Sequence, residues 1–213
     1  NFVEVKPLPS KDCEQIIRTL MERSNRKVTY EQWKLIMKAF ESCTLPLFVT
    51  LTYQQVTDWC SYDNIPPGTL MTTIEASIVK LFERMEQKHG KVFVSKAFGY
   101  ITAARNGLSE MELEDILSLD DEVLNSVFVL WVPPIRRLPP SLWSRLRLDM
   151  CPFLVERESD GISVLSWYHQ QFVNVVTERY LDYMDAIKIH HIIEEYYMGT
   201  WESLPKSFQY SPL

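Results

Sequence analysis

Glycine is scarce in this sequence, with six residues among 213. None of the six lies in the G-x-x-x-x-G-K-[ST] pattern, where glycines let backbone N–H groups converge on phosphates and a lysine reaches the terminal phosphate. The nearest fragment, Gly90–Val92, lacks the upstream glycine and the magnesium-binding hydroxyl, and Gly90 is expected to stop a helix. The sequence also lacks the G-x-S-x-G elbow and the H-E-x-x-H helix. We therefore expect this segment to have no catalytic residues and not to be an enzyme by itself.

Cysteine is also sparse, and the spacing of the four cysteines argues against both a metal site and a disulfide framework. No two cysteines form a C-x-x-C pair, so the spacing predicts neither a zinc or other metal site nor a disulfide framework. We expect buried free thiols in a reducing compartment. The residues concerned are Cys13, Cys43, Cys60 and Cys151.

Long apolar runs are absent, since no stretch approaches the roughly 20 apolar residues that a membrane-spanning helix needs. The sequence nevertheless contains 46% hydrophobic residues, which is enough for a sizeable core. Its formal net charge of −6 argues against a general electrostatic grip on nucleic acid. We expect a soluble, cytoplasmic protein of one or two globular domains.

The first part of the chain has an extended start followed by helical patterns. Residues 1–8 begin with an alternating run and are expected to form a strand whose partner strands lie upstream, in a longer protein. Residues 9–90 are predicted to form a four-helix domain that opens at Ser10 as an N-cap. Its second helix has a capping box at Thr29–Gln32. The helix over Thr69–His89 is predicted to end this domain.

Residues 91–183 have the order of elements of a winged-helix domain. A second capping box, Ser109–Glu112, opens a helix, and two short strand-like runs follow later, at Phe153–Glu158 and Ile162–Trp167. The Asp-Gly pair between these runs is a strong hairpin signal. Residues 184–213 are expected to begin a second helical region. The predicted fold class is therefore mainly α, with a four-helix domain followed by a winged-helix domain that has one β-hairpin.

Three segments in this order resemble the part of the STAND class of nucleotide-switch ATPases that follows the P-loop subdomain, in particular the NACHT and WD-repeat domain-containing proteins. The first is similar to the G-L-P-L element of that family, with Thr44 where glycine is often found. The second is similar to the start of the family's winged helix, and the third is the most specific. The segments are Cys43–Leu47, Ser109–Asp120, and Pro139–Trp143 continued through Pro152–Leu154 to Ser166–Phe172.

The resemblance implies roles for two residues. In such switches the proline of the L-P-L element packs on adenine and a winged-helix histidine reaches the phosphates of ADP, and the matching residues here are Pro46 and His169. A histidine near the start of a helix can donate to an anion in the favourable field of the helix N-terminus. The alternatives are a simple helix break at Pro46 and a histidine at position 169 that caps or packs.

The resemblance also implies partners and a cofactor. ADP or ATP would be held by an upstream P-loop domain, which would also supply most contacts to magnesium, and residues 1–8 would be its last strand. A repeat domain, expected to be a WD-repeat propeller, would follow and recognise protein partners. Switching would swing the winged helix from the nucleotide and expose surfaces for homo-oligomer formation.

Two other functions compete with this switch. The first is DNA binding, because winged helices often place a helix in the DNA major groove. Four arginines lie around the helix predicted to open at Pro139-Pro140. The wing is acidic, however, so nucleic-acid binding is disfavoured. The other alternative is a protein-interaction scaffold without nucleotide control. The arginines are Arg136, Arg137, Arg145 and Arg147, and the acidic wing residues are Glu156, Glu158 and Asp160.

Overall fold

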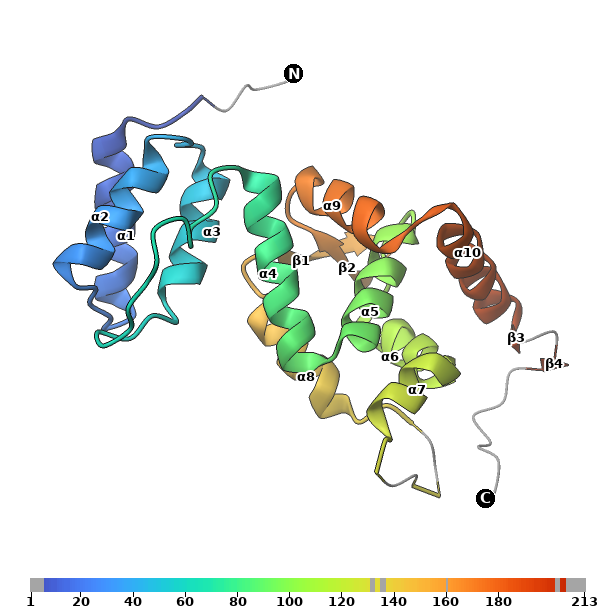
Figure 1. The fold of residues 1–213 in the computed structure, drawn as a ribbon. Coiled ribbons are helices and arrows are strands. Elements are labelled where there is room, and N and C mark those ends of the chain that lie inside the picture. Colours follow the sequence, from blue (N-terminus) through green and yellow to red (C-terminus); the bar gives the residue numbers. More distant parts are fainter. Residues whose placement is uncertain (1–5, 131–132, 135–136, 160, 202–203, 206–213) are drawn as a thin grey trace. The chain divides into compact units, whose positions relative to one another are not determined.

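The computed structural model describes residues 6–130, 133–134, 137–159, 161–201 and 204–205. The chain divides into two compact units, one up to Glu83 and one from Arg84 onward, and each is described separately (Figure 1). Of the strand predicted for residues 1–8, residues 1–5 lie outside the described part, and residues 6–8 have no regular structure.

Three helices open the first unit: α1 (Ser10–Arg23), α2 (Tyr30–Phe40) and α3 (Pro46–Val56). The capping box of α2 is confirmed, because Thr29 Oγ1 accepts from the Gln32 backbone N–H while the Gln32 side chain accepts from the Thr29 N–H. The prediction that Ser10 caps α1 is wrong. The Pro9 carbonyl already accepts helical hydrogen bonds, so Ser10 is the first helical residue.

The core of the first unit forms where α1 contacts α2 and α3. Ile17 of α1 and Ile36 of α2 are fully buried, and Phe40 meets Phe48 edge to face with ring centroids 6.2 Å apart. Each such side chain contributes about 1.5–3 kcal/mol by leaving water. Packing of apolar helix faces therefore holds this unit together.

The expectation of buried thiols holds for one cysteine only. Cys13 is fully buried on the inner face of α1, whereas Cys43 and Cys60 are half-buried and Cys151 is exposed. The last three lie at helix ends and turns, where fewer side chains cover them.

Helix α4 (Ile74–His89) is shorter than the sequence pattern predicts. It begins at Ile74 instead of Thr69, because the Thr73 hydroxyl accepts from the Ala76 backbone N–H and so caps the helix at that point. Its end is as predicted: Gly90 has a φ of +96°, which favours glycine, and separates α4 from the next helix.

The second unit has the winged-helix order of elements. The helices before the hairpin are followed by two antiparallel strands and a further helix (Figure 1). This confirms the predicted fold class, mainly helical with a winged-helix domain and a β-hairpin. The elements are α5 (Lys91–Ala103), α6 (Glu110–Leu119), α7 (Asp121–Val127), α8 (Pro140–Asp149), β1 (Leu154–Ser159), β2 (Ile162–Trp167) and α9 (Gln170–Tyr180).

The hairpin continues through one backbone bridge into the segment before α6. Strands β1 and β2 pair from Leu154 opposite Trp167 to Ser159 opposite Ile162. On the other edge of β2, the Leu165 N–H donates to the Leu108 carbonyl over 2.8 Å. Gly107 permits this approach, because a Cβ there would lie 2.8 Å from the Leu165 carbonyl oxygen.

Helix α5 is the centre of the second unit and contacts α6, α7, α9 and β2 (Figure 1). Phe98 on α5 meets Trp167 edge to face at 5.1 Å, and Trp167 stacks on Phe172 of α9 at 5.4 Å. Pairs of this geometry add about 0.5–1.5 kcal/mol beyond their buried area. This aromatic cluster fixes the hairpin and the start of α9 against α5.

Helix α10 (Tyr183–Met198) packs on α5 at Gly99, where a Cβ would lie 2.9 Å from Ile189 Cδ1. Two short paired strands follow, β3 (Thr200–Trp201) and β4 (Leu204–Pro205), which the sequence analysis did not predict. Of the predicted region 184–213, residues 202–203 and 206–213 lie outside the described part. Among the described helices, none combines the length and apolarity that crossing a membrane requires.

Candidate functional site

His169 is the N-cap residue of α9. Its backbone is extended, with φ −139° and ψ 139°, and its Nδ1 accepts a hydrogen bond of 3.2 Å from the Gln171 backbone N–H. An accepting Nδ1 carries no proton, so in this arrangement the proton of the neutral imidazole is on Nε2. The side chain is exposed. The ring therefore presents an N–H donor to solvent at the start of a helix.

The position of His169 is fixed by the residues on both sides. The Tyr168 N–H donates to the Phe153 carbonyl over 2.9 Å, which extends the pairing of the hairpin to the residue before the helix. Phe172, one turn into α9, packs on Phe153 with ring centroids 4.9 Å apart. The start of α9 is thus preorganised, which lowers the entropic cost of binding a ligand there.

Pro46 is the first residue of α3, a position where its missing N–H costs no helical hydrogen bond. It is exposed, and no side chain caps the helix before it. The preceding turn is held by the Thr44 carbonyl, which accepts from the Leu8 N–H over 3.0 Å. Pro46 lies in the first unit and His169 in the second, so each is placed only within its own unit.

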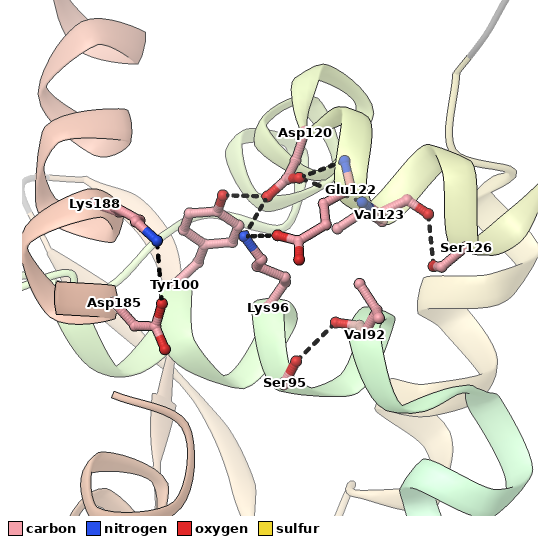
Figure 2. Close-up of polar contacts among 10 residues, drawn as sticks. All are labelled: Val92, Ser95, Lys96, Tyr100, Asp120, Glu122, Val123, Ser126, Asp185 and Lys188. Carbon is pink, nitrogen blue, oxygen red and sulfur yellow. Dashed lines mark hydrogen bonds and ion pairs between the residues drawn. The ribbon is translucent and has the colours of Figure 1, made fainter. Parts of the chain in front are cut away.

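A buried polar cluster joins α5 to the junction of α6 and α7. Figure 2 shows Lys96 and Tyr100 of α5 directed at the Asp120 carboxylate. Tyr100 donates to Asp120 over 2.7 Å, and Lys96 Nζ lies 3.3 Å from Asp120 and 2.7 Å from Glu122. Asp120 also caps α7 by accepting from the backbone N–H groups of Glu122 and Val123.

The electrostatics of this cluster favour a structural role. Burial raises the pKa of Tyr100 well above its ordinary value, and the adjacent Asp120 charge adds to the rise. Burial alone would lower the pKa of Lys96, but the contacts with Glu122 and Asp120 outweigh it and raise that pKa. Lys96 therefore stays protonated and Tyr100 stays neutral at ordinary pH. The sequence gave no signal that Asp120 has two partners on α5.

A second feature that the sequence did not indicate is a hollow of about 480 Å³ beside the hairpin. It lies among the turn after α5, the hairpin and the start of α9. His169 is not among its lining residues, although both of its neighbours are. We call it the hairpin hollow, and its polar lining includes Arg105, Asn106, Arg157, Ser166, Tyr168 and Gln170.

The arginines around α8, the helix that would enter DNA, are largely neutralised. Arg147 forms ion pairs with Glu110, at 2.6 Å, and with Glu156 of the wing. Arg137 pairs with Asp115 at 2.9 Å, and Arg145 is exposed. Two further residues weighed for this surface, Arg136 and Asp160, lie outside the described part.

The described part of the chain contains no group of three or more His, Cys, Asp or Glu side chains arranged to hold a metal ion. The chemistry that the described geometry offers is hydrogen-bond donation from His169 and from the arginines of the hairpin hollow. The second unit is therefore a winged helix with exposed hydrogen-bond donors near its hairpin.

Comparison with known proteins agrees with this class. The family model described as "NWD1-like, winged helix-turn-helix domain" matches residues 68–188. NACHT domain- and WD repeat-containing protein 1 of Homo sapiens is 38% identical over 215 residues, which cover 100% of this chain and 14% of the relative. NACHT and WD repeat domain-containing protein 2 of Mus musculus is 36% identical over 204 residues, which cover 94% of this chain and 12% of the relative. No solved structure matches the chain.

The chain therefore belongs to the NWD1-like winged helix-turn-helix family. It spans 12–14% of the length of these curated relatives, whose names include a NACHT domain and WD repeats. The resemblance stated from the sequence is confirmed.

Proposed function

We propose that this chain is the regulatory segment of a NACHT-type nucleotide switch that closes over ADP or ATP held by a P-loop domain elsewhere in a longer protein. The observation that carries the proposal is His169. Its Nδ1 accepts from the Gln171 N–H, which leaves Nε2 of an exposed imidazole free to donate a hydrogen bond at a helix start.

An anion at this point would gain from two effects. The Nε2–H donates a hydrogen bond, and the N-terminus of α9 has a partial positive charge that favours phosphate. Pro46, which is exposed at the first turn of α3, would pack on the adenine ring. Magnesium would be held mainly by residues of the P-loop domain, and none is assigned to it here.

Regulation would follow from a difference in affinity between nucleotide states. If ADP contacts His169 only when the winged helix is closed, that contact stabilises the closed state. Without the contact, the equilibrium shifts toward the open state. Opening would expose surfaces for homo-oligomer formation or for protein partners. The parent protein would be a slow ATPase, with this segment contributing control and no catalytic group.

The test uses the full protein that contains both the P-loop domain and this chain. We expect ADP to bind, and His169→Asn to weaken its affinity roughly tenfold, the value of one lost hydrogen bond to a charged group. Asparagine keeps the capping acceptor but lacks the outward donor. The same variant should raise the fraction of oligomer in light scattering.

Two results would contradict the proposal. If ADP does not bind the full protein, the switch is absent and a scaffold without nucleotide control is the better account. If ADP binds the His169→Asn variant as tightly as the unaltered protein, His169 only caps α9.

A nucleic-acid-binding winged helix is the remaining alternative, and the ion pairs of α8 weigh against it. Arg147 is held between two carboxylates and Arg137 by a third, so binding phosphate would first require breaking these pairs. Duplex DNA binding that falls with salt and is lost in Arg145→Gln would favour this alternative.

A further inference from the structure

The hairpin hollow lies beside strand β2 and is lined by residues from both faces of that strand. Side chains alternate across a strand, so Val164, Ser166 and Tyr168 share one face while Leu165 and Trp167 share the other. Trp167 belongs to the aromatic cluster with Phe98 and Phe172, and it closes the inner side of the hollow together with Leu165. Arg157 pairs with Val164 in the register and so lies on the same face of the hairpin as Val164 and Ser166.

The charges in the hairpin hollow are not balanced by carboxylates in the way those around α8 are. Arg105, in the turn after α5, and Arg157 are both exposed and line the hollow, and within the described residues neither forms an ion pair. One carboxylate, Glu158, lines the hollow too. Two guanidinium groups and one carboxylate leave a local positive charge in a chain whose net charge is −6.

The remaining lining suits a peptide. Tyr168 is 61% exposed and offers an aromatic surface with a polar tip. Ser166 Oγ is buried in the floor and has no hydrogen-bond partner among the described residues. A volume of about 480 Å³ is in the range of sites that enclose a few side chains.

From this geometry we propose that the hairpin hollow binds an acidic segment of a partner protein, with a side-chain carboxylate held by Arg105 and Arg157. The planar guanidinium group matches a carboxylate in a two-pronged hydrogen-bonding geometry, which a lysine does not. Tyr168 then covers the neighbouring part of the bound peptide.

A peptide fits better than nucleic acid. Polyanion binding rests on a row of cations that displaces counterions from successive phosphates. Here Glu158 lines the hollow beside the two arginines, so the positive charge is confined to one spot. A single carboxylate is attracted there, whereas a continuous phosphate backbone meets Glu158 as well.

This site is independent of the proposed nucleotide contact. Tyr168 and Gln170 line the hollow and His169 between them does not. The His169→Asn variant should therefore keep full affinity for an acidic peptide, so a failure of one proposal leaves the other standing.

The experiment measures fluorescence anisotropy of a labelled short peptide of alternating glutamate and serine, titrated with the full protein. We expect saturable binding that weakens roughly tenfold in Arg105→Gln and in Arg157→Gln, since each removes a charge-assisted hydrogen bond. Glu158→Gln should tighten binding because it removes a repelling carboxylate. Arg145→Gln, on the exposed face of α8, is the matched control and should bind as the unaltered protein does.

Four other results would overturn the proposal that the hairpin hollow binds an acidic peptide. The proposal is overturned if millimolar peptide gives no saturable binding, or if a matched glutamine peptide binds as well. It is also overturned if Arg145→Gln weakens binding as much as the other two variants, or if duplex DNA displaces the peptide at lower concentration. Because Arg105 and Arg157 are exposed, their variants should keep the melting temperature, which confirms that a loss of binding is local.

Discussion

Two helices of the second unit begin with the same kind of N-cap hydrogen bond, but the two capping residues lie in different surroundings. Asp120 caps α7 and His169 caps α9, and each side chain accepts a hydrogen bond from the backbone N–H two residues on. Asp120 is only 6% exposed and is also held by Tyr100 and Lys96. His169 is exposed, and among the described residues its side chain makes only the bond to Gln171. A cap surrounded by partners is committed to stability. An exposed cap such as His169 uses only one of its two ring nitrogens, so the other nitrogen can still contact a ligand.

The largest effect that separates the two caps is expected from Asp120→Ala. It removes the α7 cap and leaves the buried Tyr100 hydroxyl without its acceptor, which together cost about 2–4 kcal/mol of unfolding free energy. Urea denaturation, with hydrogen exchange of the α5 amides, measures the loss. Asp182→Ala removes the exposed cap of α10 and is the matched control, with about 1 kcal/mol expected. Equal losses in the two variants would show that the partners on α5 add nothing.

Next in size is Glu86→Gln, which tests how the other end of α9 is held. Glu86 of α4 accepts from Arg179 Nε at 3.0 Å and from Arg179 Nη2 at 3.1 Å, and it also accepts from the Tyr180 hydroxyl. We expect a loss of about 1–2 kcal/mol in urea denaturation at pH 7. Glu178→Gln, at an exposed position on α9, should change stability by less than about 0.5 kcal/mol.

The contribution of Glu86 should also depend on pH. Burial would raise its pKa, but the hydrogen bonds from Arg179 and Tyr180 outweigh burial and lower the pKa below its ordinary value of 4.5. A carboxyl whose pKa is lower in the folded state stabilises above the unfolded value, and this contribution is lost as the pH falls through the folded pKa. The stability difference between the unaltered protein and Glu86→Gln should therefore shrink below about pH 4.5. A constant difference down to pH 2 would contradict this account.

Tyr100→Phe is expected to cost less, about 1 kcal/mol, because it removes one hydrogen bond and keeps the buried ring. Lys96 remains beside the Asp120 carboxylate at 3.3 Å, so the charge is not left alone. Thermal denaturation of Tyr100→Phe beside Tyr183→Phe, a position that is 80% exposed, measures the difference. A loss as large as that of Asp120→Ala would mean that the hydroxyl, and not the cap, holds α7.

The smallest effect on stability is expected from His169→Asn. Asparagine is among the best N-cap residues, so without nucleotide the unfolding free energy should change by less than about 0.5 kcal/mol. His169→Ala, which removes the cap as well, should lose up to about 1 kcal/mol. Circular dichroism melting curves distinguish the two. A large loss in His169→Asn would make His169 a structural residue like Asp120.

The sequence predicts the features that depend on near neighbours. The capping boxes at Thr29 and Ser109 are present as predicted, and so is the hairpin around Gly161. These signals work because a hydroxyl and an amide or carboxylate three residues apart satisfy each other's backbone donors. The predicted start of α4 is wrong, because several threonines precede the helix and only the structure shows that Thr73 caps it.

The polar clusters and the hairpin hollow could not be read from the sequence. Tyr100 and Asp120 are 20 residues apart, and Arg105 and Arg157 are farther apart still, so only packing of α5 against the other elements brings them together. His169 was found from a resemblance, and the structure adds the orientation of its ring. The functional roles of His169 and Pro46 stay predictions.

The most direct test of the nucleotide-switch proposal is the thermal shift produced by ADP in the full protein, measured for the unaltered chain, His169→Asn and His169→Ala. Saturating ADP should stabilise the unaltered protein, by about 2.7 kcal/mol at a hundredfold excess over Kd. Both variants should show a smaller shift at the same ADP concentration, although His169→Asn without ADP melts like the unaltered protein. An equal ADP shift in all three proteins would contradict the proposal and leave His169 as a cap of α9 alone.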